Sequence, residues 1–361
     1  MLRGLIKTGL ASTLHLTGTD RLLARCTSVG RMPLVIGYHR VVEDFRAAAA
    51  RSIPPMLTSV RTFERQLDWI GRRFKFITLN DLATTMEKAR QFNRPVVAIT
   101  FDDGYADLYH HAFPILRRKG IPAAVFVVTD LVGTSRFQIY DELYLLLSDV
   151  FSRRGESRRH LVGLLLGLGI PVPVLKKVEI AVRDPFRATQ AMIGHLSQAE
   201  VARVIEALRA EVGLPESPME DLHALSWEML REMSRSGVTV GSHSRTHARL
   251  TQENWKKVLD ETQGSRQELE CRLGTTVEHF AYPGGAFNAG VVSAVAAAGY
   301  RCAYTSCQHR DARHPALTIP RRLWWEKSCM DAFERFSPAV MSCDVGGVFD
   351  FKPSCRKTHG S

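Results

Sequence analysis

The chain has 361 residues, of which 45% are hydrophobic and 24% charged, and its formal net charge at pH 7 is +11. These values are those of an ordinary soluble globular protein with room for a core, in one large α/β domain or two smaller ones. The basic residues are spread out and accompany no nucleic-acid recognition motif, so we expect no nucleic-acid partner and a surface with weak attraction for anionic glycans or lipid headgroups.

The first 32 residues predict an N-terminal helical arm. Lys7 and His15 interrupt its apolar stretch, which is more typical of an amphipathic helix than of a secretory signal, and no later segment has the apolar length of a membrane span. The seven cysteines are odd in number and form no C-x-x-C pair, which favours free thiols in a reducing compartment. We therefore expect a cytoplasmic protein that can associate peripherally with a membrane.

From residue 33 to 325, short apolar runs alternate with helical patterns. Strand signals fall at 33–38, 95–101, 123–128, 238–242, 279–282 and 302–305, with a shorter one at 76–79. Helical patterns fall at 63–70, 105–119, 226–236, 252–273 and 291–298, and Asn80 or Asp81 can cap the helix after residue 79. Strands that alternate with helices predict a parallel sheet or barrel.

Two regions depart from this alternation. Residues 133–218 lack strong strand signals and predict a helical insertion, with helices at 141–151, 159–168 and 197–212. Residues 326–361 are assigned as a C-terminal tail, for which the sequence predicts no element.

Two adjacent carboxylates, Asp102 and Asp103, stand where the apolar run 95–101 ends and a helix begins. Barrel enzymes place catalytic groups at the C-terminal ends of their strands, and a turn there can bring both carboxylates to one pocket in different roles. The alternative is that Asp103 only caps the next helix and Asp102 is a turn residue.

His243 and His247 follow the strand at 238–242. Two histidines four residues apart can give two imidazole nitrogens to one metal ion, and Asp103 would complete a His₂-carboxylate set with open positions for water and substrate. The alternative is a solvated loop with two unrelated histidines.

Two further strand ends carry candidate residues. A Pro-Gly-Gly turn at 283–285 lets the backbone approach a ligand, and an N–H there can stabilise an oxyanion. His39 follows the first strand and is a candidate general acid, because imidazole titrates near neutral pH.

Together these residues resemble the polysaccharide deacetylase family (carbohydrate esterase family 4, the NodB homology domain). Thr-Phe-Asp-Asp-Gly at 100–104 matches its first motif, and His-Ser-Arg-Thr-His at 243–247 its second. The resemblance spans residues 33–322 without the insertion. It implies a distorted (β/α)₇ TIM-like barrel and zinc or another divalent metal. It also implies that Asp102 is the general base and that Asp103, His243 and His247 are the metal ligands.

The third motif departs from the family's common Arg-Pro-Pro-Tyr-Gly. Ala281 stands in the position of the arginine that braces the catalytic aspartate, and Gly284 in that of the tyrosine. The Gly284 N–H can still serve the oxyanion, and Arg321 or Arg322 can replace the brace. The family's late Leu-x-Leu-x-His element is also absent.

Some members that act on poly-N-acetylglucosamine are circularly permuted and carry the acid histidine in an early Tyr-His pair. Tyr38-His39 looks like that arrangement. His39 is therefore our candidate for the acid, with His309 and His314 as alternatives.

The expected activity is hydrolysis of N-acetyl groups on an amino-sugar glycan. Asp102 would take a proton from the attacking water, the Gly284 N–H would hold the oxyanion, and His39 would protonate the leaving amine. Two alternatives remain open: an O-acetyl esterase or small-amide hydrolase with the same site, and an inactive carbohydrate-binding homologue.

Overall fold

The computed structural model describes residues 2–20, 33–152, 157–181, 184–212 and 220–350. Its centre is a parallel sheet in the strand order β10-β9-β8-β7-β6-β5-β1-β11, and β4 pairs with the first two residues of β5. The strands are β1 (Leu34–Tyr38), β4 (Lys75–Phe76), β5 (Val96–Phe101), β6 (Ala123–Val127), β7 (Thr239–Ser242), β8 (His279–Ala281), β9 (Cys302–Thr305), β10 (Ile319–Pro320) and β11 (Arg322–Leu323). A two-stranded sheet pairs β2 (Arg40–Val42) with β3 (Leu57–Ser59).

The sheet closes on itself through one short segment. Only Arg321 separates β10, which pairs with β9, from β11, which pairs with β1. The Arg321 N–H donates to the Thr305 carbonyl and the Trp324 N–H to the Gly37 carbonyl, each at 2.8 Å. Residues 319–324, with β10 and β11, therefore occupy the seventh strand position of a nearly closed barrel. This confirms the expected (β/α)₇ fold.

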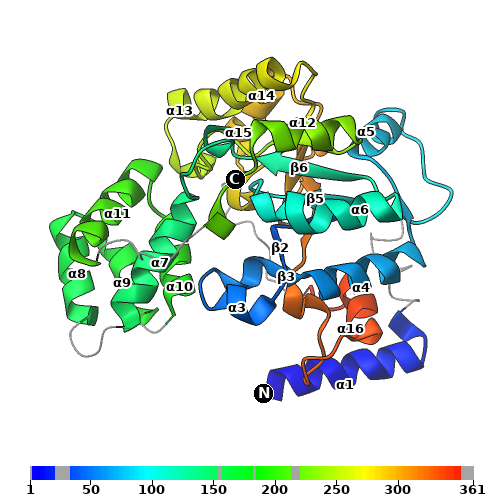
Figure 1. The fold of residues 1–361 in the computed structure, drawn as a ribbon, viewed down its shortest axis with the longest axis horizontal. Coiled ribbons are helices and arrows are strands. Elements are labelled where there is room, and N and C mark those ends of the chain that lie inside the picture. The colour runs from blue at the N-terminus through cyan, green and yellow to red at the C-terminus, as the bar shows by residue number, and fades with distance from the viewer. Residues whose placement is uncertain (1, 21–32, 153–156, 182–183, 213–219, 351–361) are drawn as a thin grey trace.

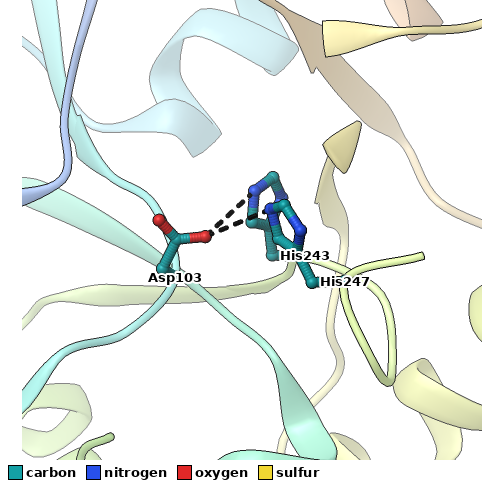
Figure 2. Close-up of side chains that lie close together, drawn as sticks. All are labelled: Asp103, His243 and His247. Carbon is teal, nitrogen blue, oxygen red and sulfur yellow. Dashed lines mark ion pairs between the residues drawn. The ribbon is translucent and has the colours of Figure 1, made fainter. Parts of the chain in front are cut away.

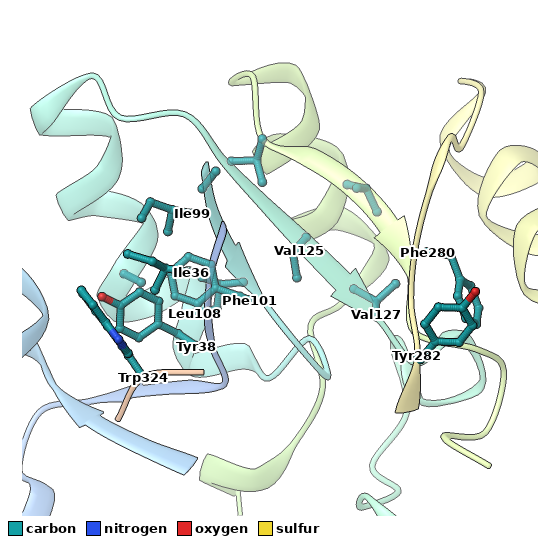
Figure 3. Packing of buried hydrophobic residues seen from close by; sticks show 14 of the residues in the cluster. Ile36, Tyr38, Ile99, Phe101, Leu108, Val125, Val127, Phe280, Tyr282 and Trp324 are labelled. Carbon is teal, nitrogen blue, oxygen red and sulfur yellow. The ribbon is translucent and has the colours of Figure 1, made fainter. Parts of the chain in front are cut away.

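The strands are buried on both faces, as their continuous apolar runs predicted. One set of side chains, including Tyr38, Phe101 and Val125, packs toward the surrounding helices (Figure 3). The alternate set includes Ala98, Ala124, Phe126 and Tyr304, which face the inside of the ring of strands and form a second cluster together with residues of helix α5. The site therefore rests on a packed interior rather than on an open channel.

The helices between the strands lie close to their predicted positions, except α3 (Phe45–Ala49), which falls where no helix was predicted. The others are α4 (Val60–Gly71), α5 (Leu79–Glu87), α6 (Phe113–Lys119), α12 (Trp227–Arg235), α13 (Trp255–Leu259), α14 (Ser265–Leu273) and α15 (Ala289–Ala297). The N-cap of α5 is Thr78: its hydroxyl accepts from the Asp81 N–H, and the Asp81 carboxylate accepts from the Thr78 N–H. The prediction that Asn80 or Asp81 is the N-cap was therefore wrong. The predicted helices 105–119 and 252–273 each contain a π-helical turn, at Leu108–Ala112 and Asp260–Gly264.

In the described part of the insertion there are five α-helices, two more than were predicted. These are α7 (Ile139–Ser152), α8 (Ser157–Gly167), α9 (Val172–Ile180), α10 (Pro185–Ile193) and α11 (Gln198–Val212). They form a group beside the barrel (Figure 1) and bury an apolar cluster of their own. The predicted insertion's last residues, 213–218, lie outside the described residues.

The two ends of the described chain meet below the barrel. Helix α1 (Leu2–Leu16) packs against α16 (Pro338–Val345), a helix in the region where the sequence predicted no element (Figure 1). Within the described residues, no helix combines the length and the apolar character that a bilayer crossing requires. The five described cysteines are free thiols, and Cys26 and Cys355 lie outside the described residues.

Candidate active site

The predicted site residues gather at one rim of the barrel. The carboxyl ends of parallel strands lie at the same end of a barrel, and the site residues follow four different strands or join two. These residues line one cavity of about 300 Å³: His39 after β1, Asp102 and Asp103 after β5, His243 and His247 after β7, Gly284 after β8, and Arg321 between β10 and β11.

Asp103, His243 and His247 converge within this cavity (Figure 2). Oδ1 of Asp103 lies 3.5 Å from Nε2 of His243 and 3.3 Å from Nε2 of His247. Ligand atoms that sit about 2.1 Å from one tetrahedral ion lie about 3.4 Å apart, so these distances suit a single divalent cation.

The surroundings of both imidazoles favour their metal-binding form. The Nδ1–H of His243 donates to the Ala281 carbonyl at 2.7 Å, which leaves the Nε2 lone pair directed at Asp103. Burial lowers the pKa of His243, and burial followed by the His243 charge lowers the pKa of His247 well below its usual value. Both rings are therefore neutral at pH 7, as metal binding requires.

The Asp103 carboxylate is poorly satisfied without a cation. Both of its oxygens are buried and neither meets a donor of the described residues in hydrogen-bond geometry, although the nearby Tyr140 hydroxyl favours the charged form of the carboxylate. Burial, and then the Asp102 charge, raise the pKa of Asp103 well above its usual range. Asp103 has a φ of 70° and its side chain makes no capping bond, so the alternative that it only caps a helix fails. A divalent cation fits this donor set.

Arg321 pairs with Asp102 through two hydrogen bonds. Nη1 of Arg321 donates to Oδ1 of Asp102 at 2.6 Å, and Nη2 donates to Oδ2 at 2.7 Å, with both side chains buried. Burial alone would raise the pKa of Asp102, but the Arg321 charge holds it at about 2. Arg322, the other candidate, instead pairs with Asp350.

His39 and Gly284 face the same cavity. Nε2 of His39 lies 4.0 Å from Oδ2 of Asp103, and burial lowers the pKa of His39 to about 4. Gly284 adopts a φ of 60°, which its missing side chain permits. The alternative acids His309 and His314 do not line the cavity: His309 stacks on Phe287, and His314 lies in a surface turn with Asp311.

The sequence did not single out the rest of the cavity wall. Tyr140 of α7 packs edge-on against His247, with the ring centroids 5.0 Å apart. Helix α10 supplies Phe186, Thr189, Gln190 and Ile193, and Arg249 follows two residues after His247. A signal for α10 was present, because Asp184-Pro185 is a typical helix start.

The sequence matches the family model for polysaccharide deacetylases over residues 89–158 and 174–303, more than half of the chain. The chain belongs to the polysaccharide deacetylase family. The matched residues of this deacetylase include Asp102, Asp103, His243 and His247, and His39 and Arg321 lie outside them.

Curated relatives match a shorter part of the deacetylase. The poly-β-1,6-N-acetyl-D-glucosamine N-deacetylase of Staphylococcus epidermidis is 31% identical over 112 residues, which cover 29% of this chain and 38% of the relative. The enzyme of the same name from Staphylococcus aureus is 31% identical over 116 residues, covering 30% and 40%. The match thus spans about two fifths of the length of these relatives.

Solved structures share the fold over most of the deacetylase chain. The Streptococcus pyogenes deacetylase PplD in complex with acetate superposes with a TM-score of 0.54 at 16% identity, covering 90% of this chain and 99% of that one. IcaB from Ammonifex degensii superposes with a TM-score of 0.51 at 19% identity, covering 88% and 97%. At these identities the likeness shows the fold alone.

Proposed function

We propose that this protein is a metal-dependent hydrolase that removes N-acetyl groups from an amino-sugar polysaccharide. One observation carries the proposal: a buried His₂-carboxylate triad and an arginine-braced aspartate share one cavity at the strand-end rim. The names of the staphylococcal relatives support N-acetylglucosamine as the sugar. A carbohydrate-binding homologue without activity would not need this second, braced carboxylate beside the triad.

Asp103, His243 and His247 would hold the cation. Two imidazoles and one carboxylate with open positions are typical of catalytic zinc, although other divalent ions bind such a set. When bound, the cation polarises the acetyl carbonyl and lowers the pKa of water in the site.

The other residues would handle protons and orient the substrate. Asp102, kept ionised by Arg321, accepts a proton from the water that attacks the acetyl carbon. The Gly284 N–H donates to the acetyl oxygen. The carbon–nitrogen bond then breaks, and the nitrogen takes a proton from His39, which leaves a free amine and acetate. Because the His39 imidazole is neutral in the free site, the proton that Asp102 takes from the water would pass to His39 in the substrate complex and from there to the nitrogen, so that no proton is left over.

Acetate release from defined substrates tests this function. We expect the metal-loaded protein to release acetate from β-1,6-linked N-acetylglucosamine oligomers, and chelation to lower the rate at least about a thousandfold. Re-addition of zinc should restore the activity. An equal or higher rate on oligomers that carry O-acetyl groups but no N-acetyl groups would instead favour the esterase. No acetate from either substrate would favour an inactive binding protein.

We also propose that α1 rests on an anionic lipid surface. Leu5, Ile6 and Leu10 are 45%, 61% and 44% exposed on one face of α1, and α1 contains Arg3 and Lys7 but no acidic residue. The Ala332 N–H donates to the Thr8 hydroxyl, which places the 68% exposed Phe333 beside α1. An apolar face on a basic helix is typical of interfacial membrane binding. We propose a cytoplasmic location with this surface on the membrane.

Vesicle flotation tests the membrane proposal. We expect the protein to float with vesicles that contain phosphatidylglycerol, and Leu5→Ser/Ile6→Ser/Leu10→Ser to weaken partitioning at least about tenfold, because each buried leucine contributes about 1.5–3 kcal/mol. The control, Leu166→Ser/Val172→Ser, alters two exposed apolar side chains of the insertion and should float like the wild type. Equal flotation of all three proteins would contradict the proposal.

A further inference from the structure

Arg249 is a cation without a counter-charge in the wall of the catalytic cavity. Its Nε is buried and finds no hydrogen-bond acceptor, and no carboxylate lies within ion-pair distance of its guanidinium among the described residues. The other arginine of the cavity, Arg321, also has an Nε without a partner in the described part of the chain, but its charge is neutralised by Asp102 through two hydrogen bonds. Arg249 therefore holds a positive charge that the described fold does not neutralise.

The position of Arg249 joins the barrel to the insertion. Its Nη1 lies 3.8 Å from where a Cβ on Gly284 would stand, and equally far from where a Cβ on Gly194 would stand. Gly284 belongs to the turn proposed to hold the acetyl oxygen, and Gly194 ends helix α10. The guanidinium thus lies next to the reaction centre, on the side where the neighbouring part of a bound glycan would meet the insertion.

The wall around Arg249 offers no competing negative charge. Helix α10 lines the cavity with an aromatic, two uncharged polar and one aliphatic side chain: Phe186, Thr189, Gln190 and Ile193. The two carboxylates of the cavity are already engaged, Asp102 by Arg321 and Asp103 facing the two imidazoles. Any anion that Arg249 binds must therefore come from outside the described chain.

A partly desolvated guanidinium loses hydration that only a strong acceptor restores. Its planar donors match the two oxygens of a carboxylate or phosphate, and such charge-assisted bonds are about twice as strong as neutral ones. A neutral sugar hydroxyl accepts one bond and leaves the charge uncompensated. The net charge of +11 also attracts acidic polymers to the protein as a whole.

We propose that Arg249 binds an anionic substituent, a carboxylate or a phosphate, on the glycan next to the N-acetylated sugar. The proposal rests on the proposed function and narrows it: the natural substrate is an acidic amino-sugar polysaccharide. Arg249 is then a specificity-determining residue that takes no part in the chemical step.

Binding measurements test this without relying on turnover. Calorimetry with metal-loaded full-length protein compares three oligosaccharides of equal length. In the first, N-acetylglucosamine alternates with glucuronic acid. The second is the same oligosaccharide with its carboxyl groups reduced to alcohols. The third is the reduced form with phosphate esters on those alcohols. We expect one acidic form to bind roughly ten- to a hundredfold more tightly than the reduced form, the usual range for a charged hydrogen bond. The form that binds tightly identifies the anion.

Two variants complete the test. Arg249→Gln should abolish the preference for the acidic form and leave affinity for the reduced form unchanged, and Arg249→Lys should keep part of the preference. The control Arg187→Gln removes a positive charge from the exposed side of α10 and should bind like the wild type. Thermal unfolding checks that each variant is folded.

Equal affinity of the wild type for all three oligosaccharides would overturn the proposal, as would a loss in Arg249→Gln that affects the acidic and reduced forms alike. Acetate release is measured on the same samples. Arg249-dependent binding without acetate release would contradict the proposed activity but uphold the anion site.

Discussion

Replacing Asp103 with asparagine is expected to remove the cation and lower acetate release at least about a thousandfold. The cation contributes several kcal/mol to the barrier, and each 1.36 kcal/mol is a factor of ten. Asparagine keeps the shape of the side chain but loses the charge that faces Nε2 of His243 and of His247. Elemental analysis after dialysis and initial rates of acetate release measure both effects.

The effect of Asp103→Asn on the free energy of unfolding should have opposite signs in the metal-free and the zinc-loaded protein. In the metal-free protein, Asp103→Asn removes a buried carboxylate whose charge is disfavoured by burial and by the neighbouring Asp102, so we expect the free energy of unfolding to rise by about 1 kcal/mol or more. Zinc at a hundred times its Kd should stabilise the wild type by about 2.7 kcal/mol and the variant far less. The control Asp68→Asn, on the exposed surface, should behave like the wild type.

A destabilised metal-free Asp103→Asn, or one that zinc stabilises as strongly as the wild type, would contradict this account. The first result would mean that the Asp103 carboxylate supports the fold through contacts other than a cation, and the second that zinc binds without this carboxylate.

Replacing Asp102 with asparagine is expected to keep the cation and lower acetate release by about 10²- to 10⁴-fold, the usual contribution of a general base. The same change leaves the buried Arg321 guanidinium without its carboxylate, which should cost about 3–5 kcal/mol of stability. Rates and metal content are measured alongside chemical unfolding.

A double-variant cycle separates the two roles of Asp102. In Asp102→Asn/Arg321→Met, the buried charge is gone together with its partner, so the loss of stability should be smaller than the sum of the two single losses. Activity should stay as low as in Asp102→Asn. Near-wild-type activity in Asp102→Asn would show that another group accepts the proton, and additive stability losses would show that the pair does not act as a unit.

Much of the barrel could be predicted because each strand has a local sequence signal. A continuous apolar run such as 95–101 followed by Asp102 marks both a buried strand and its carboxyl end. Parallel strands then bring such ends to one rim, so the convergence of Asp103 with His243 follows from topology. The choice of Arg321 over Arg322 did not follow, because only the split between β10 and β11 decides which side chain faces Asp102.

The remaining errors have local physical causes. Thr78 caps α5 through a reciprocal pair of hydrogen bonds with Asp81, and the neighbouring polar residues Asn80 and Asp81 drew the prediction away from it. The predicted helix 105–119 changes to π geometry at Leu108–Ala112, just before Pro114, which lacks a backbone N–H.

The insertion's part in the site could not be predicted, since its helices pack on one another and their patterns do not say which one meets the barrel. Helix α10 lines the cavity because of tertiary packing against α7 and α9. The role proposed for Arg249 could not be predicted either, because only the structure shows that no carboxylate among the described residues faces it.

The most direct test of the central claim is anomalous diffraction at the zinc edge from crystals grown with zinc. The account predicts one strong peak per chain, within bonding distance of a carboxylate oxygen of Asp103 and of Nε2 of both His243 and His247. No peak there, or a peak bound by other residues while acetate release proceeds, would contradict it.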